Sequence, residues 1–247
     1  MQIDLQGRVV LVTGAGSGIG RAMASAFADA GASVWVNDLS EAAADETVDA
    51  IRAGGGAAHP VVADVTRADA VTAMVEAIVT AEGRLDCMVN NAAIVQVKPF
   101  LELGEDDWDH VLTTNLKSVF LTCRAVLPQM QRQGAGVVIN LASELAYLGR
   151  ALYAPYTASK GGVIALTRSL AREFAPEIRV NGIAPGPVDT PMLRSEMALT
   201  DADETGIPAG RLGRPEEIAA AAVFLASDAA GFFYGEIISP NGGALMR

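Results

Sequence analysis

The sequence predicts one doubly wound α/β domain, in which helices flank both faces of a parallel, seven-stranded sheet. Short apolar runs alternate with longer amphipathic or alanine-rich stretches from end to end, which is typical of successive β-α-β units. No internal linker interrupts this alternation, and 247 residues with 51% hydrophobic content are enough for one substantial core. We therefore expect residues 1–247 to form a single domain.

Seven short runs are the candidate strands of this sheet. Most are nearly continuous in apolar residues, as strands covered on both faces require. The runs comprise residues 8–12, 33–37, 57–62, 87–90, 136–141, 179–183 and 236–239.

Six longer stretches between the strands are the candidate helices. The last begins with Pro215, Glu216 and Glu217, which suit a first helical turn whose backbone N–H groups have no partners. The stretches comprise residues 18–30, 41–53, 67–82, 106–133, 155–174 and 215–227.

One irregular stretch, residues 185–214, departs from the alternation. It carries Pro, Gly, Thr and Asp around a short apolar piece at residues 192–199. Long loops in compact α/β domains often cover a functional site. We therefore expect a substrate flap at about residues 187–212.

The charge balance excludes several classes of partner. A formal net charge of -11 opposes binding to nucleic acid or to an anionic membrane through long-range repulsion. No apolar run approaches the 18 residues that a membrane span needs, and the first eight residues lack a basic segment followed by an apolar one. The sequence predicts a soluble, cytoplasmic protein that acts on a small molecule.

The cysteines and histidines show no metal-binding or disulfide pattern. Cys87 and Cys123 have no paired spacing, so we interpret both as reduced core residues. His59 and His110 have no carboxylate or cysteine at a recognisable ligand spacing, and we take both as structural. No metal site is predicted.

A glycine-rich turn, residues 13–20, directly follows the first strand and opens the first helix. Its glycines lie where a pyrophosphate would approach a helix N-terminus, and the missing side chains let phosphates come close. A tight turn also needs glycine for purely structural reasons, so the turn alone is a weak signal. Its candidate cofactor-binding residues are Gly14, Ser17, Gly18, Ile19 and Gly20.

An acidic residue at the end of the second strand indicates which dinucleotide would bind. Asp38 lies 24 residues after Gly14, where a carboxylate accepts hydrogen bonds from both adenosine ribose hydroxyls and repels a 2′-phosphate. Ser17 and Leu39 offer no positive partner for that phosphate. The prediction is NAD rather than NADP. The alternative is that Asp38 caps the next helix, where Ser40 competes for that position.

Tyr156 and Lys160 form the candidate catalytic pair. Residues four apart lie on the same face of a helix, so the phenol and the ammonium can reach one site. An unperturbed tyrosine, with a pKa of about 10, is a poor base at neutral pH. The Lys160 cation and the positive nicotinamide ring of an oxidised cofactor would favour the phenolate, which could then take a proton from an alcohol. The alternative is a half-buried tyrosine anchor beside a solvated lysine.

Over nearly its whole length the chain resembles the short-chain dehydrogenases/reductases, which have a Rossmann-type fold. The resemblance implies that Ser143, 13 residues before Tyr156, hydrogen-bonds the substrate oxygen. It implies that Lys160 also holds the nicotinamide ribose hydroxyls, and that the backbone of Asn115 holds a water of a proton relay. The resemblance rests on residues 13–20, Asp64-Val65, residues 90–93, Asn115, Ser143, residues 156–160, Asn181 and Pro185-Gly186.

The same resemblance implies further cofactor contacts. Asp64 and Val65 would flank the adenine, Asn91 and Ala92 would line the cofactor channel, and Thr190 would touch the carboxamide. Structural alternatives remain, because Asp64 could cap a helix, Asn91 could be a turn residue and Ser143 could satisfy backbone groups at a strand end. Pro185, Gly186 and Val188 complete the set.

Two positions depart from the family pattern. Ala93 stands where the family more often has glycine, which narrows the space beside the cofactor. Asn241 precedes Gly242 and Gly243 where the family has aspartate, near the C-terminal packing that family tetramers use. The resemblance implies a homotetramer, although the residues themselves leave a dimer open.

The predicted substrate contacts are mostly apolar, which favours a partly hydrophobic secondary alcohol or ketone, although packing in the core explains them equally well. Glu144 is the exception. It could hydrogen-bond a second hydroxyl of a diol or polyol, or it could be a solvated strand-end carboxylate. The candidates are Ser143, Glu144, Leu145, Tyr153, Met192 and Met197.

Three functions remain open at this point. The first is an NAD-linked dehydrogenase of a secondary alcohol, diol or polyol. The second is a 3-oxoacyl-carrier-protein reductase, which residues 207–228 also resemble. Asp38 and the net acidity oppose it, although Arg132, Arg168 and Arg172 could form a local basic patch for an acidic carrier protein. The third is an NAD-binding protein without catalysis, for which the Ser143, Tyr156 and Lys160 set would have no use.

Overall fold

The computed structural model describes residues 3–200 and 207–246, apart from the side chains of residues 196–200. Within these residues, seven parallel strands form one sheet in the order β3-β2-β1-β4-β5-β6-β7. The order reverses between β1 and β4, which is the doubly wound topology that the sequence predicts. The expected strands are confirmed, and no end moves by more than one residue. The strands are β1 Val9–Thr13, β2 Ser33–Asp38, β3 Ala57–Val62, β4 Cys87–Asn90, β5 Gly136–Leu141, β6 Ile178–Ile183 and β7 Ile237–Ile238.

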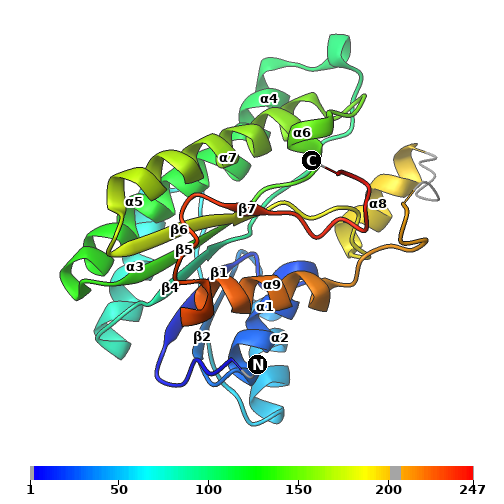
Figure 1. Ribbon diagram of the computed structural model, residues 1–247. Coiled ribbons are helices and arrows are strands. Elements are labelled where there is room, and N and C mark those ends of the chain that lie inside the picture. The colour runs from blue at the N-terminus through cyan, green and yellow to red at the C-terminus, as the bar shows by residue number, and fades with distance from the viewer. Residues whose placement is uncertain (1–2, 201–206, 247) are drawn as a thin grey trace.

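Helices cover both faces of the sheet. Figure 1 shows α3, α4, α5 and α7 over one face, and α1, α2 and α9 over the other. The helices are α1 Gly18–Asp29, α2 Glu41–Ala53, α3 Ala68–Glu82, α4 Glu105–Leu112, α5 Ser118–Gln133, α6 Leu145–Leu148, α7 Ala154–Phe174, α8 Pro191–Thr200 and α9 Pro215–Ala226, with the short turns η1 Phe100–Glu102, η2 Thr113–Lys117 and η4 Asp228–Ala230.

Each face of the sheet has its own apolar core. Met23 and Phe27 pack with Ile218 beneath α1 and α9, whereas Ile78 and Met130 pack beneath α3 and α5 on the other face. The central strands β1 and β4 are buried along their whole length, which explains their continuous apolar sequences. The edge strand β3 departs from this expectation because it alternates between exposed and covered residues.

The single helix expected over residues 106–133 is interrupted. A π-helical turn, η2, lies between α4 and α5 and contains Asn115, which is fully buried. The Asn115 side chain accepts a hydrogen bond from Ile94 N at 2.9 Å and donates to Ile94 O at 2.9 Å. A widened turn of this kind re-aims one side chain inside an otherwise regular helix. Helical periodicity alone does not reveal it, because the partner, Ile94, is distant in sequence.

The predicted flap region contains a helix and is closed at its base. Asp189 N donates to Gly213 O at 2.9 Å, and Gly213 N donates to Pro187 O at 2.9 Å. These two bonds join the ends of the segment, and α8 rises between them beyond the carboxyl ends of the strands (Figure 1). Residues 201–206 lie outside the described part of the flap.

The described helices include none that is long and apolar enough to cross a membrane. Cys87 and Cys123 are buried and are not disulfide-bonded. Burial raises the pKa of each thiol to about 12, so neither is a reactive thiolate at neutral pH.

Candidate active site

One pocket lies at the carboxyl ends of the central strands, where ligands bind in open α/β sheets. Its walls come from the last residue of β2, from the loops that follow β1, β4, β5 and β6, and from the first turns of α1 and α7, and the start of α8 closes one side. Most residues expected from the sequence line it: Gly14, Ser17, Gly18, Ile19, Gly20, Asp38, Asn91, Ala92, Ser143, Glu144, Leu145, Tyr156, Lys160, Pro185, Gly186, Val188, Thr190 and Met192.

The glycine-rich turn has no room for side chains at Gly14 and Gly20. Gly14 has a φ of +60°, and a Cβ there would lie 2.9 Å from the Cα of Ala92. A Cβ on Gly20 would collide with the carbonyl oxygen of Gly14. The glycines therefore allow the backbone to fold tightly against the loop after β4. The structural need for glycine at this turn is thus evident, and its role in cofactor binding stays a prediction.

The first turn of α1 is suited to an anion. Ser17 is the N-cap residue, and its side chain makes no capping hydrogen bond. No acidic residue lies in the first turn, so the positive end of the helix faces the pocket without a counter-charge of its own. A Cβ on Gly18 would lie 3.5 Å from the Cγ2 of Thr190, so the start of the predicted flap lies beside this turn. These features fit a pyrophosphate.

Asp38 is fixed at the carboxyl end of β2, where it lines the pocket. Its Oδ2 atom accepts a hydrogen bond from Gly16 N at 3.0 Å, and its Oδ1 atom accepts from Ser40 N at 3.0 Å. The N-cap of α2 is Ser40, whose Oγ accepts from Ala43 N at 3.3 Å. The capping alternative for Asp38 is therefore wrong, and Asp38 lines the pocket; its contact with a ribose stays a prediction.

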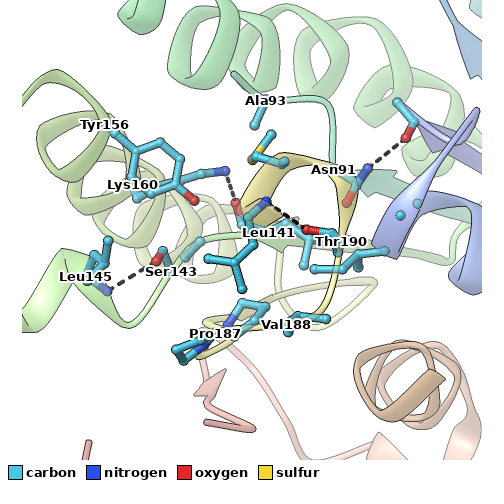
Figure 2. Close-up of a pocket in the computed structure, with 18 of the residues that line it drawn as sticks. Asn91, Ala93, Leu141, Ser143, Leu145, Tyr156, Lys160, Pro187, Val188 and Thr190 are labelled. Atoms are coloured by element: carbon cyan, nitrogen blue, oxygen red, sulfur yellow. Dashed lines mark hydrogen bonds between the residues drawn. The ribbon is translucent and has the colours of Figure 1, made fainter. Parts of the chain in front are cut away.

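Asn91 joins the turn to the neighbouring strand. Its Nδ2 atom donates to Thr13 O at 2.9 Å and to Gly14 O at 3.1 Å, while its backbone N–H donates to Thr13 Oγ1 at 3.0 Å. Asn91 itself lies in an irregular stretch and not in a turn, so that alternative is wrong. Its side chain holds the glycine-rich turn in place, and the residue lines the pocket (Figure 2).

Tyr156 and Lys160 lie together in the first half of α7. The Nζ atom of Lys160 is 5.7 Å from the centroid of the Tyr156 ring, and Figure 2 shows the two side chains side by side. Lys160 is 3% exposed and its Nζ donates to Leu141 O at 2.7 Å. Burial lowers the pKa of the ammonium to about 8. The alternative of a solvated lysine is wrong, and the group stays mainly cationic at neutral pH.

Ser143 follows β5 and is 7% exposed. Its Oγ accepts a hydrogen bond from Leu145 N at 3.2 Å, so the hydroxyl does satisfy a backbone group at the strand end. An oxygen that accepts from the backbone still has its own proton to donate. Ser143 can therefore hydrogen-bond a substrate oxygen while the turn after β5 holds it in place (Figure 2).

Asn115 lies behind the pocket and does not line it. Besides the two bonds to Ile94, its Nδ2 donates to Ser159 Oγ at 3.1 Å. Ser159 Oγ in turn donates to Tyr156 O at 2.7 Å. The side chain thus connects the loop after β4 to the helix that carries the tyrosine. The relay role implied by the resemblance concerns its backbone and stays a prediction.

Glu144 is 5% exposed, so the interpretation as a solvated strand-end carboxylate is wrong. Tyr153 does not line the pocket. It is 1% exposed, and its ring lies 5.0 Å from the Cζ of Arg150, so packing explains its apolar character. The side chain of Met197 lies outside the described residues.

Asp64 and Val65 also lie outside the pocket lining. The Oδ1 atom of Asp64 accepts hydrogen bonds from Thr66 N at 2.9 Å and Thr66 Oγ1 at 2.6 Å. These bonds hold the pKa of Asp64 below its ordinary value. Asp64 therefore closes a local turn after β3, and an adenine contact stays a prediction for both residues.

Several lining residues were not expected. Arg150 is the one with most chemical consequence, because it brings a second cation to the half of the pocket that holds Lys160. The available signal was its position between Ser143 and Tyr156, the interval in which substrate contacts were expected. The missed residues are Leu141, Ala142, Arg150, Pro187 and Pro191.

The fold and the pocket together define a class of protein. A doubly wound sheet presents a glycine-rich turn and the carboxylate of Asp38 on one side of a pocket, and Tyr156 with the buried Lys160 cation on the other. Such a pocket serves an oxidoreductase that uses a nicotinamide dinucleotide.

Comparisons with known proteins agree with this class. The model of the family described as "Enoyl-(Acyl carrier protein) reductase" matches residues 14–244. The 3-oxoacyl-[acyl-carrier-protein] reductase FabG of Thermotoga maritima is 40% identical over an alignment of 246 residues, and the match covers 98% of this chain and 99% of that protein. The 3beta-hydroxysteroid dehydrogenase 1 of Eggerthella lenta is 41% identical over an alignment of 252 residues, and the match covers 100% of this chain and 97% of that protein.

A solved structure has the same fold over the whole chain. The short-chain type dehydrogenase/reductase from Mycobacterium marinum superposes with a TM-score of 0.96 at 36% identity, and the match covers 100% of this chain and 98% of that one. The chain belongs to the short-chain dehydrogenase/reductase family, and the resemblance found in its sequence is confirmed.

Proposed function

We propose that this protein is an NAD-linked oxidoreductase that interconverts a secondary alcohol and a ketone. The observation that carries the proposal is the pairing, in one pocket, of Asp38 at the ribose end with Ser143, Tyr156 and Lys160 at the other. Both relatives named above act, by their names, on an alcohol or a ketone, which supports the same reaction type.

Each group of the proposed site has one chemical task. When bound, the dinucleotide supplies the acceptor or donor of the hydride. Ser143 donates a hydrogen bond to the substrate oxygen. The Tyr156 phenolate takes the hydroxyl proton as the alcohol is oxidised, and returns it in reduction. The Lys160 cation stabilises that phenolate electrostatically, because the two lie close together in a buried setting.

The preference for NAD follows from charge. A 2′-phosphate at the ribose would stand against the Asp38 carboxylate. Among the residues that line the described pocket, the cations are Arg150 and Lys160, which belong to the substrate side. The nearby Arg21 is engaged with Gly16 O and with Glu46 at 3.0 Å. None of these three cations is therefore placed to offset the repulsion between Asp38 and a 2′-phosphate.

The second candidate is a 3-oxoacyl-carrier-protein reductase, and the names of the relatives favour it over an alcohol dehydrogenase. The basic patch suggested by the sequence does not support it. Arg132, Arg168 and Arg172 lie in the last turns of α5 and α7, which lead into the amino ends of β5 and β6. That edge of the sheet is opposite the pocket, so a carrier protein bound there would not deliver its acyl group.

One assay separates the candidates. The protein is incubated with NAD or NADP and secondary alcohols, and with NADH or NADPH and butanone or acetoacetyl-CoA, while absorbance of the reduced cofactor is followed. We expect NAD-dependent oxidation of alcohols and NADH-dependent reduction of butanone. Faster turnover of acetoacetyl-CoA with NADPH than of any simple ketone with NADH would favour the second candidate. Absence of turnover in every arm would contradict both.

The homotetramer and the cytoplasmic location implied by the family resemblance stay proposals of the same kind. Sedimentation equilibrium would test the first, with a tetramer expected. Cell fractionation in the source organism would test the second, with the protein expected in the soluble fraction.

A further inference from the structure

We infer that Asn140 and Thr167 are positioning residues for the proposed catalytic pair on α7. They act by fixing where that helix lies along β5, and so how close the Lys160 ammonium is held to the Tyr156 ring. The inference deepens the proposed function and rests on it. Neither positioning residue is among the described residues that line the pocket, and both are 0% exposed. Their effect on the reaction must therefore pass through the helix that carries the pair.

A chain of hydrogen bonds crosses the core from α5 to α7. The Oγ1 atom of Thr122 donates to Asn90 Oδ1 at 2.5 Å, and Asn90 Nδ2 donates to Asn140 Oδ1 at 2.8 Å. The Nδ2 atom of Asn140 donates to Thr167 Oγ1 at 2.9 Å, and that hydroxyl donates to Val163 O at 2.8 Å. The four residues that contribute side chains are at most 4% exposed. The chain therefore ties two helices and two strands together inside the core.

The polar side chains of this chain lie where apolar ones would also pack. Val138 is on the same face of β5 as Asn140, and Val163 lies about one turn before Thr167 on the same face of α7. Both valines belong to the apolar core on this side of the sheet. Apolar contacts alone let a helix slide over a sheet, whereas hydrogen bonds between particular buried atoms favour one register. The chain is thus suited to specifying where α7 lies.

The helix α7 is bonded to the end of β5 at two points, and the second point is the proposed catalytic lysine. The Nζ atom of Lys160 donates to Leu141 O at 2.7 Å, and Leu141 directly follows Asn140 (Figure 2). Lys160 and Thr167 are seven residues apart, so they lie about two turns apart on one face of α7. Two bonds at this separation fix the position of the helix along the strand and its tilt. Loss of the bond at Thr167 would let the helix move relative to Leu141 O.

A shift of α7 would change the separation of the catalytic pair. The Lys160 ammonium is held by Leu141 O, whereas Tyr156 would move with the helix; the Nζ atom lies 5.7 Å from the Tyr156 ring centroid. The attraction between a cation and a phenolate falls with distance, and it is strong here because Lys160 is buried. A longer separation would weaken the phenolate, so that alcohol oxidation would need a higher pH. The other ionisable side chains among the described lining residues, which every variant below retains, are Asp38, Glu144 and Arg150.

The hydroxyl of Thr167 can be removed with little change in shape. Thr167→Val removes it and leaves the Asn140 amide N–H without this acceptor, whereas Thr167→Ser keeps the hydroxyl and loses only a methyl group. The matched control is Thr72→Val on α3, where an exposed hydroxyl donates to Ala68 O at 2.9 Å in the same way. Thr167→Ala replaces Thr167→Val if the valine variant does not fold, since it removes the same hydroxyl without adding a branched side chain.

The first measurement is kcat and its pH dependence for oxidation of a secondary alcohol with NAD, together with NADH affinity by fluorescence. In Thr167→Val we expect kcat at pH 7.5 to fall at least about tenfold and the midpoint of the pH profile to rise by at least about half a pH unit. The Kd for NADH should stay within about threefold, because the glycine-rich turn and Asp38 belong to other elements. Thr167→Ser and Thr72→Val should resemble wild type in all three quantities.

The second measurement needs no turnover. Tyrosinate absorbance is titrated without cofactor in wild type and in Thr167→Val, and again in each with Tyr156→Phe added, so that the difference reports Tyr156. The midpoint of this difference should be higher in Thr167→Val. Unchanged kcat and an unchanged midpoint in Thr167→Val, or equal losses in Thr167→Ser, would overturn the inference. So would a loss of NADH affinity as large as the loss of kcat, which would indicate general damage to the fold. If the wild type turns over no alcohol or ketone, the proposed function fails, and the tyrosinate titration still decides the positioning role.

Discussion

The Oδ2 atom of Asp38 accepts a hydrogen bond from the backbone N–H of Gly16 at 3.0 Å, which fixes the carboxylate against the glycine-rich turn. A Cβ on Gly16 would lie 2.6 Å from that same oxygen, so glycine is what permits the approach. The Asp38 carboxylate is therefore held in position by a backbone group of the turn.

Replacing this carboxylate should relax the choice of dinucleotide. In Asp38→Ala the repulsion of a 2′-phosphate and the acceptor for the ribose hydroxyls are both removed. We expect the ratio of kcat/KM for NAD over NADP to fall at least about tenfold, on the order of 1.4 kcal/mol. Steady-state kinetics with both cofactors measure the ratio. Asp49→Ala, an exposed change later on α2, is the control; an unchanged ratio in Asp38→Ala would reject the electrostatic explanation.

The buried ammonium of Lys160 should leave a signature in the pH dependence of stability. Its pKa of about 8 lies below the ordinary lysine value of about 10.4, so between these values the unfolded chain binds a proton that the folded chain has released. The free energy of unfolding should therefore rise with pH across this interval, by as much as about 3 kcal/mol from this group.

The measurement compares wild type with Lys160→Met, without cofactor, by urea unfolding at pH 7.5 and pH 10. The same pair is also compared on a Tyr156→Phe background, because Lys160 acts on the neighbouring Tyr156 phenol. Other groups that titrate in this range contribute nearly equally to both members of each pair. The difference in unfolding free energy, wild type minus variant, should be larger at pH 10. A difference in unfolding free energy that stays constant with pH would mean that the pKa of Lys160 is not lowered in the folded state.

The tight approach at Gly20 predicts a packing defect. In Gly20→Ala the new Cβ would collide with Gly14 O and lie 2.6 Å from Asn91 Nδ2, so the turn must shift. Overpacking of this kind destabilises a protein by about 1–3 kcal/mol. We expect a lower Tm and weaker NADH binding. The control is Gly161→Ala on α7, where a Cβ meets nothing within 4 Å and should be neutral or stabilising; equal Tm values for the two variants would contradict the prediction.

Short-range patterns predicted the parts of the site that depend on local backbone geometry. The turn at Gly14 needs a positive φ, and Tyr156 and Lys160 need only helical spacing, so both could be recognised from residue types and intervals. The strands were predicted for a similar reason, since burial on two faces produces continuous apolar runs.

Features that depend on distant partners were less predictable. The π-helical turn at Asn115 forms around contacts to Ile94, and residues 106–133 have no local signal of it. The burial of Glu144 depends on the loop after β6, through Pro185 O. Tyr153 was assigned to the substrate because pockets and cores share apolar composition, and its packing against Arg150 becomes evident only in three dimensions.

The central claim is that Tyr156, supported by Lys160, exchanges the proton that accompanies hydride transfer. The most direct test measures Tyr156→Phe, which keeps the ring and removes only the hydroxyl. NADH affinity, followed by fluorescence titration, should stay within about threefold of wild type, while kcat/KM for alcohol oxidation with NAD should fall at least about a hundredfold. Retention of most of the wild-type activity by a variant that still binds NADH would contradict the account.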